Sequence, residues 1–398
     1  MTEVVIAVVL TALVFDFTNG FHDTANAMAT SIASGALRPR VAVLLAGLLN
    51  LVGAFLSVQV ALTISSGLVD EALITPEVIF GGLVGAIVWN LLTWLLGMPS
   101  SSSHALFGGL IGATWAFAGT GAINFSTVVG KLLVPLALSP IVAGLVALAA
   151  TGIVYRLAAR GDRRTMTRGF RSAQVVSASM VALAHGTNDA QKTMGVITLT
   201  LITVGLLPTG SAPPMWVIVS AGVAIAAGTA MGGWRIIHTM GRRISDVETP
   251  QGFAAETAGA AVILSAAHLG FALSTTQVAA GAVVGSAAGR GAGQVRWHVA
   301  GRMVATWLLT LPSAAVMGAL AAWVAARGTA GTVAVGVALV VASAVIYALS
   351  RRAPVHAGNV NELPSRAPDR VLEVGAAAKQ GGDPQVEKQF PEPARAAA

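Results

Sequence analysis

Two acidic motifs interrupt otherwise apolar sequence. Residues 19–26 read Asn-Gly-Phe-His-Asp-Thr-Ala-Asn, and residues 185–192 read His-Gly-Thr-Asn-Asp-Ala-Gln-Lys. Carboxylates at membrane depth are costly and for that reason usually functional. Asp23 and Asp189 therefore predict sites for a coupling cation, either a proton or Na⁺, as a symporter requires. Amide oxygens also suit a hard cation such as Na⁺. Three asparagines of the motifs supply them: Asn19, Asn26 and Asn188.

A hydroxyl cluster follows each acidic motif. The clusters are Ser101, Ser102 and Ser103 in the first half, and Ser274, Thr275 and Thr276 in the second. The first comes after Pro99, and because proline is accepted in the first turn and serine caps helices, a helix is predicted to begin there. A helix N-terminus offers free N–H groups and partial positive charge, which suit an oxyanion. Two such helices that meet predict a site for a tetrahedral anion. Further candidate ligands are Asn26, Asn188 and Lys192.

Structural roles are open for the same side chains. The hydroxyls could bond to carbonyls of their own helices at sites of close helix contact. Asp189 could pair with Lys192, which follows three residues later on one helix face, and Asp23 with His22. Lys192 could instead face the anion. Glu256, at the start of an apolar segment, is either a further intramembrane acid or an interfacial one.

The elements that must position these residues are membrane helices. Mean hydropathy is +0.75, with 55% hydrophobic and 10% charged residues, outside the range of soluble domains. Many apolar segments approach the roughly 20 residues that span a bilayer. They lie at 4–34, 41–64, 78–97, 101–118, 127–155, 173–205, 214–233, 253–268, 274–289, 297–325 and 331–349. Several are too long or too short for one straight helix. The sequence thus predicts an all-α polytopic membrane protein with about ten to twelve transmembrane helices, some of them broken or re-entrant.

Composition also excludes several classes. Continuous apolar runs differ from the short alternating strands of a β-barrel. The chain has no cysteine, so disulfides and thiolate metal sites are excluded. The net charge of +7 is assigned to loops, because no soluble basic face suited to nucleic acid is evident.

The order of motifs occurs twice. Asp23 and Asp189 are 166 residues apart (189 − 23), and Ser101 and Ser274 are 173 apart (274 − 101). Each half carries an acidic motif, two apolar segments and then a hydroxyl motif, which predicts two repeats with the site between them. Four regions follow: a first transmembrane repeat at 1–155, a basic cytoplasmic loop at 156–172, a second transmembrane repeat at 173–349, and a tail at 350–398 that is predicted to be disordered from its composition.

Positive charges predict the orientation. Six arginines lie between 156 and 171, and the positive-inside rule places them in the cytoplasm. Counting back five crossings puts the N-terminus outside, together with the acidic loop at 70–77. An odd number of crossings per half makes the two repeats inverted, an arrangement typical of alternating-access transporters.

These motifs resemble the inorganic phosphate transporter (PiT, or Pho4) family over roughly residues 5–325. The resemblance rests on 19–27, on Pro-Ser-Ser-Ser-Ser-His at 99–104, and on Ala-His-Gly-Thr-Asn-Asp-Ala-Gln-Lys at 184–192. It implies a multi-pass cell membrane protein with inverted repeats that imports phosphate with Na⁺ or protons. The first motif is most similar to the bacterial low-affinity phosphate permease branch, which takes up a neutral metal–phosphate complex with protons.

Two departures from the family pattern concern the coupling ion. The second hydroxyl motif reads Ala-Leu-Ser-Thr-Thr-Gln at 272–277, without the family's usual proline and histidine, and Asn50 stands where some relatives carry glutamate. Coupling to H⁺ and coupling to Na⁺ are therefore both retained. Some relatives carry sulfate, so sulfate or another tetrahedral oxyanion is the alternative substrate. No cofactor is implied beyond the coupling ion and a co-transported divalent metal, and a homodimer is left open.

Two other functional classes fit the sequence less well. A hydrolase would need Ser103 and His104 to act together, but adjacent residues on a helix point in different directions. Gln277 also replaces the histidine in the second motif. A channel would need a continuous polar or charged ring. The sequence predicts a transporter and not an enzyme.

Overall fold

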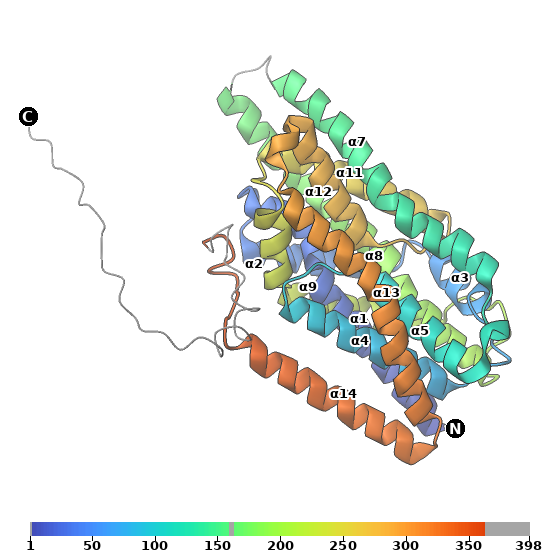
Figure 1. Ribbon diagram of the computed structural model, residues 1–398. Coiled ribbons are helices and arrows are strands. Elements are labelled where there is room, and N and C mark those ends of the chain that lie inside the picture. The colour runs from blue at the N-terminus through green and yellow to red at the C-terminus, as the bar shows by residue number, and fades with distance from the viewer. Residues whose placement is uncertain (1, 159–162, 363–398) are drawn as a thin grey trace, which may run out of the picture. The chain divides into compact units, whose positions relative to one another are not determined.

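Helices make up the described chain. The computed structural model describes residues 2–158 and 163–362, and within those ranges the only β-structure is an isolated bridge (Figure 1). The chain divides into two units, Met1–Leu363 and Pro364–Ala398, and the second lies outside the described residues. The predicted all-α class is confirmed.

The two acidic motifs lie in the longest helices of their halves, α1 and α8, of 32 and 41 residues. The first half contains α1 (Thr2–Ala33), α2 (Pro39–Gly53), α3 (Gln59–Gly67), α4 (Pro76–Leu95), α5 (Ser102–Ala118), η1 (Thr120–Ala122), α6 (Phe125–Thr127), the π-helical turn η2 (Val128–Leu133) and α7 (Val134–Ala158). The second half contains α8 (Arg163–Thr203), α9 (Met215–Met231), α10 (Trp234–His238), the π-helical turn η3 (Thr239–Arg243), α11 (Thr249–His268), α12 (Thr275–Arg290), η4 (Ala292–Gln294), α13 (Trp297–Ala325) and α14 (Thr329–Ser350).

Several helices are long and apolar enough to cross a membrane. Five segments of the described chain meet this condition: Glu3–Ala33, Pro76–Leu95, Phe125–Leu157, Trp297–Ala325 and Thr329–Ser350. A sixth is formed if Met215–Met231 and Trp234–Arg243, which are bent by 60°, count as one broken span. Some other predicted segments are shorter helices, such as α5 and α12 with 17 and 16 residues, whereas the segment at 173–205 falls in the 41-residue α8. The multi-pass prediction is confirmed, with fewer uninterrupted spans than apolar segments in the sequence.

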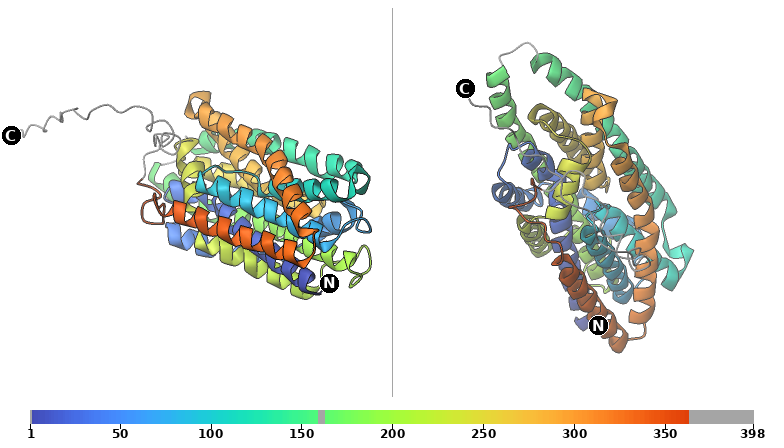
Figure 2. Two further views of the ribbon diagram at one scale, coloured as in Figure 1. Left: turned by 60° about the horizontal axis from the view of Figure 1, so that its bottom comes forward. Right: turned by 60° about the vertical axis from the view of Figure 1, so that its left-hand side comes forward.

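The outer helices present apolar side chains to their surroundings. Leu308 and Leu320 on α13 are 73% and 61% exposed, and Val340 on α14 is 68% exposed. Exposed apolar surface of this extent is unusual for a monomer in water, whereas in a bilayer it contacts lipid. Helix α14 lies along one edge of the helices, against α4 and α13 (Figure 2).

Central helices of each half pack against helices of the other half, so the packing is exchanged between the halves. Helix α1 packs against α9 of the second half, and α8 packs against α2 of the first. Likewise α5 packs against α13, and α12 against α7. A Cβ added at Gly20 on α1 would lie 2.2 Å from the carbonyl oxygen of Ile225 on α9. One added at Gly186 on α8 would lie 2.3 Å from that of Asn50 on α2. Both crossings therefore depend on the same close contact, with the roles of the halves reversed.

Much of the segment 156–172 is helical. Helix α7 continues to Ala158 and α8 begins at Arg163, so the predicted loop is shorter than the arginine-rich stretch. The residues between the two helices, 159–162, lie outside the described chain. Arginine is a good helix former, and for this reason a high density of arginines does not by itself indicate a loop. The cytoplasmic side of this segment stays a prediction.

Residues 351–362 contact the other helices. Composition predicts disorder after α14, but the structure places these residues in turns. Arg235 on α10 donates from Nη2 to the carbonyl oxygen of Ala353 at 2.6 Å, and Val360 is 1% exposed. Hydrogen-bond donors and an apolar site on the other helices thus order this segment. Its own composition does not indicate that it is ordered. The disorder predicted for 363–398 concerns residues outside the described chain.

Candidate functional site

Two helices begin at the hydroxyl clusters. Ser101 caps α5 by accepting a hydrogen bond from the His104 N–H at 3.1 Å, and Ser274 caps α12 by accepting from the Gln277 N–H at 3.2 Å. The backbone angles of the two caps are nearly identical, with φ −92° and ψ 109° in one and φ −94° and ψ 108° in the other. The predicted helix start is confirmed, and it recurs in the second half. The N–H groups of each first turn have no partner within their helix.

Two glycines turn the chain into these helices. Gly97 and Gly270 have φ values of 65° and 73°, which glycine adopts without strain. The Gly97 N–H bonds the Trp94 carbonyl at 2.9 Å, and the Gly270 N–H bonds the Ala267 carbonyl at 3.3 Å, so each closes the preceding helix. The chain then enters the interior, where the residues of both hydroxyl clusters are at most 1% exposed.

Asp23 on α1 accepts hydrogen bonds from both hydroxyl clusters. Ser102 Oγ donates to Oδ2 at 2.7 Å, and Thr276 Oγ1 donates to Oδ1 at 3.2 Å. His22 Nδ1 lies 2.5 Å from Oδ1. The carboxylate is fully buried, so these contacts replace water. The pairing of Asp23 with His22 therefore occurs together with the hydroxyl contacts.

Asp189 on α8 has an ammonium partner. Lys192 Nζ lies 2.6 Å from Oδ1. Thr275 Oγ1 donates to Oδ2 at 3.2 Å, and Asn19 Nδ2 donates to the same oxygen at 3.3 Å. His185 Nε2 is 3.4 Å from Oδ2 without forming a hydrogen bond of normal geometry. Lys192 thus faces Asp189 in this structure.

The two acids come together in one buried polar cluster. Asp23, His185 and Asp189 each offer a ligand atom, and these atoms lie within 4.8 Å of one another. Asn26 links α1 to the second hydroxyl cluster by donating from Nδ2 to Thr276 Oγ1 at 3.1 Å. The cluster therefore joins carboxylates from α1 and α8 to hydroxyls from α5 and α12. Such a set can hold a small cation between the carboxylates and offers N–H and O–H donors to an oxyanion.

Some predicted ligands point elsewhere. Ser103 Oγ donates to the Leu273 carbonyl at 3.0 Å, so it does not pair with His104. Asn188 Nδ2 contacts the Phe271 carbonyl at 3.5 Å. Ser103 thus bonds a carbonyl of the other half and not one of its own helix, while Ser101 and Ser274 accept from backbone N–H groups. Three hydroxyls bond the acids directly: Ser102, Thr275 and Thr276.

Comparison with known proteins relates this cluster to a family. The model of the phosphate transporter family (PHO4) matches residues 19–318, a range that includes both acidic motifs and both hydroxyl clusters. This chain belongs to the phosphate transporter family. A protein of Mycobacterium tuberculosis (strain ATCC 25618 / H37Rv), named "Probable low-affinity inorganic phosphate transporter", is 57% identical over 358 residues, covering 89% of this chain and 86% of that protein. A Bacillus subtilis (strain 168) protein of the same name is 42% identical over 318 residues, covering 79% and 95%.

A solved structure has the same fold. The structure titled "The sodium-dependent phosphate transporter" superposes with a TM-score of 0.73 at 23% identity, covering 81% of this chain and 99% of that one. Family membership and the apolar spans establish a multi-pass cell membrane protein. They also confirm the prediction of a transporter and not an enzyme, because the matched family is one of transporters.

One hydrogen-bonded chain in this transporter has the order of a serine hydrolase triad. His22 Nε2 lies 3.2 Å from Ser100 Oγ, while His22 Nδ1 contacts Asp23. Ser100 Oγ is also 2.7 Å from Thr93 Oγ1, and its residue is fully buried. A serine enclosed in this way is not accessible to a substrate. In this transporter the chain orients His22 toward Asp23.

Sequence reasoning missed Asp16. It lies on α1 of this transporter, seven residues before Asp23, and it is fully buried. Neither carboxylate oxygen has a hydrogen-bond partner among the described residues. Seven residues are about two helical turns, so Asp16 lies on the same face of α1 as Asp23. This spacing is the signal in the sequence that could have identified Asp16.

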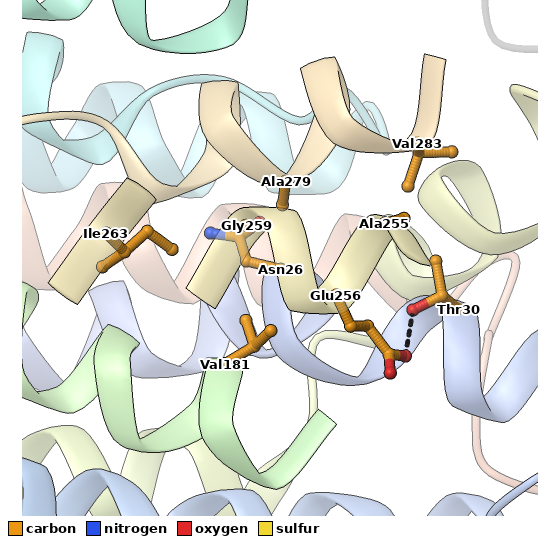
Figure 3. A pocket seen from close by; sticks show the side chains of 9 residues that line it. All are labelled: Asn26, Thr30, Val181, Ala255, Glu256, Gly259, Ile263, Ala279 and Val283. Atoms are coloured by element: carbon orange, nitrogen blue, oxygen red, sulfur yellow. Dashed lines mark hydrogen bonds between the residues drawn. The ribbon is translucent and has the colours of Figure 1, made fainter. Parts of the chain in front are cut away.

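Glu256 on α11 is a further buried acid of this transporter, 4% exposed. It accepts hydrogen bonds from Thr30 Oγ1 at 2.6 Å, Ser177 Oγ at 2.5 Å and Gln174 Nε2 at 3.2 Å. Figure 3 shows its carboxylate beside Thr30, on the wall of a cavity of about 10 Å³ that Asn26 also lines. This volume is about that of one water-sized probe. Burial among α1 and α8 favours the intramembrane interpretation over an interfacial one.

Proposed function

We propose that this transporter imports inorganic phosphate by secondary active symport with H⁺ or Na⁺. The observation that carries the proposal is that the acids of the two halves meet the same two helix N-termini: Asp23 accepts hydroxyls from α5 and α12, and Asp189 accepts one from α12. Ligands for a cation and for an anion thus occupy one place. Opposite charges in a buried site favour each other's binding, and this mutual dependence is what symport requires. The substrate class comes from the names of the relatives.

The anion site is proposed at the first turns of α5 and α12. Their N–H groups and positive ends favour an oxyanion. Ser102, Thr275 and Thr276 here donate to carboxylates, so phosphate binding requires these hydroxyls to turn to the phosphate oxygens. A cation that binds the carboxylates compensates for the donors they lose. Cation and phosphate binding are thereby linked through the same three side chains.

The coupling cation is proposed to bind at Asp23 and Asp189, with Asn19 and Asn188 as amide ligands. The Oδ1 atoms of both asparagines are buried without a hydrogen-bond partner among the described residues, as acceptors awaiting a cation would be. H⁺ and Na⁺ both remain candidates. The resemblance to the bacterial branch adds entry of phosphate as a neutral complex with a divalent metal, and sulfate is the alternative substrate.

Alternating access by two inverted repeats, 1–155 and 173–349, is the proposed motion. The exchanged helix packing, the matched glycine contacts and the matched caps support it, because each feature of one half has its counterpart in the other. The cluster is built within one chain, so it does not require a homodimer.

Uptake of radiolabelled phosphate into proteoliposomes tests the function. We expect accumulation above equilibrium when a Na⁺ or a pH gradient is imposed separately, with and without Mg²⁺. The matched control is Asp70→Asn, which removes an exposed acid outside the cluster. Uptake that never exceeds equilibration under either gradient contradicts symport. Stronger competition by sulfate than by phosphate favours the alternative substrate.

Cysteine labelling tests the inverted topology. Because the chain has no cysteine, a single cysteine at Asp70 should react with an impermeant maleimide in intact cells. One at Arg168, in the arginine-rich segment, should react only after permeabilisation. Labelling of both positions from the same side contradicts an odd number of crossings between them.

A further inference from the structure

Asp16 is a buried acid without a counter-charge. It is 0% exposed, and neither of its carboxylate oxygens has a hydrogen-bond partner among the described residues. An isolated carboxylate is among the costliest groups to bury, and buried charges are normally paired or coordinate a metal. Nothing described so far assigns it a partner.

Two neighbouring residues, Asn19 and Thr193, also carry a buried oxygen without a hydrogen-bond partner among the described residues. Asn19, three residues later on α1 and hence on the same face, uses Nδ2 to bond Asp189 and leaves Oδ1 without a partner. Thr193 on the adjacent helix α8 is fully buried with an unpaired Oγ1. Both side chains interact with the Asp16 carboxylate, although neither makes a hydrogen bond of normal geometry to it. The Asp16 carboxylate and the Thr193 hydroxyl thus lie together on two packed helices, and none of their three oxygens makes a hydrogen bond of normal geometry.

The nearby charges define what could fill this place. Lys192 and Asp189 both act electrostatically on Asp16, but the ammonium of Lys192 lies 2.6 Å from Asp189 and is engaged there. An ionised Asp16 therefore has no ammonium of its own as a counter-charge. An oxygen-only ligand set is typical of hard cations. The neighbouring ammonium favours a single positive charge over a divalent one, because like charges repel.

We propose that Asp16 and Thr193 Oγ1 form a binding site for a small monovalent cation, with Na⁺ as the matching probe, separate from the Asp23–Asp189 pair. The site deepens the proposed function, because it adds a second cation position to the same symporter. Asn19 connects the two positions, since its Nδ2 bonds Asp189 and its side chain also interacts with Asp16. Occupancy of the new site thus acts on Asp189 through one side chain.

Binding of ²²Na⁺ to the purified full-length transporter tests the site. Asp16→Asn keeps the side-chain shape but removes the charge, and we expect it to bind one Na⁺ fewer per chain than the wild type. Thr193→Val removes one ligand oxygen, and we expect roughly 5- to 150-fold weaker binding of that Na⁺. Thr198→Val is the matched control, because Thr198 is another fully buried α8 threonine with an unpaired hydroxyl and is not part of the proposed site. It should bind Na⁺ as the wild type does.

The outcomes separate this site from the proposed function. A Na⁺ stoichiometry and affinity in Asp16→Asn equal to those of the wild type overturn the site, and so does a wild type that binds no Na⁺ and responds to protons only. Thermal unfolding of each variant in detergent checks folding, and Asp16→Glu should retain the Na⁺ if Asp16→Asn proves unstable. Phosphate uptake is measured independently. Its absence from a wild type that loses one Na⁺ on Asp16→Asn refutes phosphate symport while leaving the cation site standing.

Discussion

The surroundings of Asp23 and of Asp189 differ in one decisive contact. Each carboxylate accepts a hydroxyl from the corresponding position of its own half, Ser102 for Asp23 and Thr275 for Asp189. Only Asp189 also has an ammonium, that of Lys192. With the offset of 166 residues, the position that matches Lys192 is Asn26, which bonds the hydroxyl of Thr276 instead.

The two halves thus have similar backbones around their acids but different side-chain charges at matched positions. The negative charge of Asp189 is balanced inside the protein, whereas that of Asp23 is met by hydroxyls and an imidazole. Of the two carboxylates, that of the first half is thus the one without an ammonium partner among the described residues. The second half carries a fixed positive charge beside the proposed anion site.

The largest expected effect is the loss of phosphate uptake on substitution of Asp23. Asp23→Asn should reduce gradient-driven phosphate uptake to the level of empty liposomes, because the group that receives the coupling cation is gone. No buried partner ammonium is left behind, so the variant should unfold near the wild-type temperature. Uptake assays with thermal unfolding in detergent measure both. Normal accumulation by this variant would refute the assignment of Asp23 as a coupling residue.

Removal of the ammonium that balances Asp189 should lower the stability of the fold. Lys192→Met leaves Asp189 buried without its cation, which should cost about 3–5 kcal/mol in the free energy of unfolding. The double variant Lys192→Met with Asp189→Asn removes both charges and should recover most of that loss without recovering transport. A double-mutant cycle from denaturant unfolding gives the coupling. Additive effects of the two changes would show that the 2.6 Å contact contributes little.

The matched hydroxyls should give similar, smaller effects. Ser102→Ala and Thr275→Val each remove one donor, at a cost of about 1–3 kcal/mol in phosphate binding, or roughly 5- to 150-fold in affinity. Titration calorimetry with phosphate measures them. Ser103→Ala is the control, because that hydroxyl bonds a backbone carbonyl. A deficit confined to one of the two variants would mean that only one helix N-terminus contacts the anion.

The smallest effect is expected at the matched crossings. Gly20→Ala and Gly186→Ala place a methyl group 2.2 and 2.3 Å from a carbonyl oxygen of the partner helix. Each should destabilise the fold by about 1–3 kcal/mol. Gly152→Ala on α7, where an added Cβ meets nothing within 4 Å, is the control. Destabilisation at one crossing only would break the equivalence of the halves.

The sequence revealed the helices, the two helix starts and most of the polar cluster. Buried carboxylates and amides in apolar runs are conspicuous, and Pro99 with the serines after it marks a helix start. The partners were harder to predict, since Ser103 could bond an anion or the Leu273 carbonyl, and only the approach of another segment decides. Asp16 was missed because its unpaired state depends on what surrounds it.

The ordered segment 351–362 shows the same limit. Its composition resembles that of disordered chain, and Ala353 in it accepts a hydrogen bond from Arg235, more than one hundred residues earlier (353 − 235 = 118). Local sequence carries no information about such distant donors. Likewise, the helical start of α8 within an arginine-rich stretch could be predicted only from helix propensity and not from charge.

The exchanged packing has a consequence for biosynthesis. Helix α1 enters the membrane early, yet the helix that covers Gly20 begins 195 residues later in the chain (215 − 20). Until then the side of α1 that carries Gly20 lacks the helix that covers it, and the partners of Asn19 and Asp23 on α8 and α12 also belong to the second half. A ribosome that stalls after the first half leaves an incomplete polar helix in the bilayer, the kind of exposed intermediate that membrane quality control removes. The two halves of this transporter mature together because each supplies helices that pack against the other.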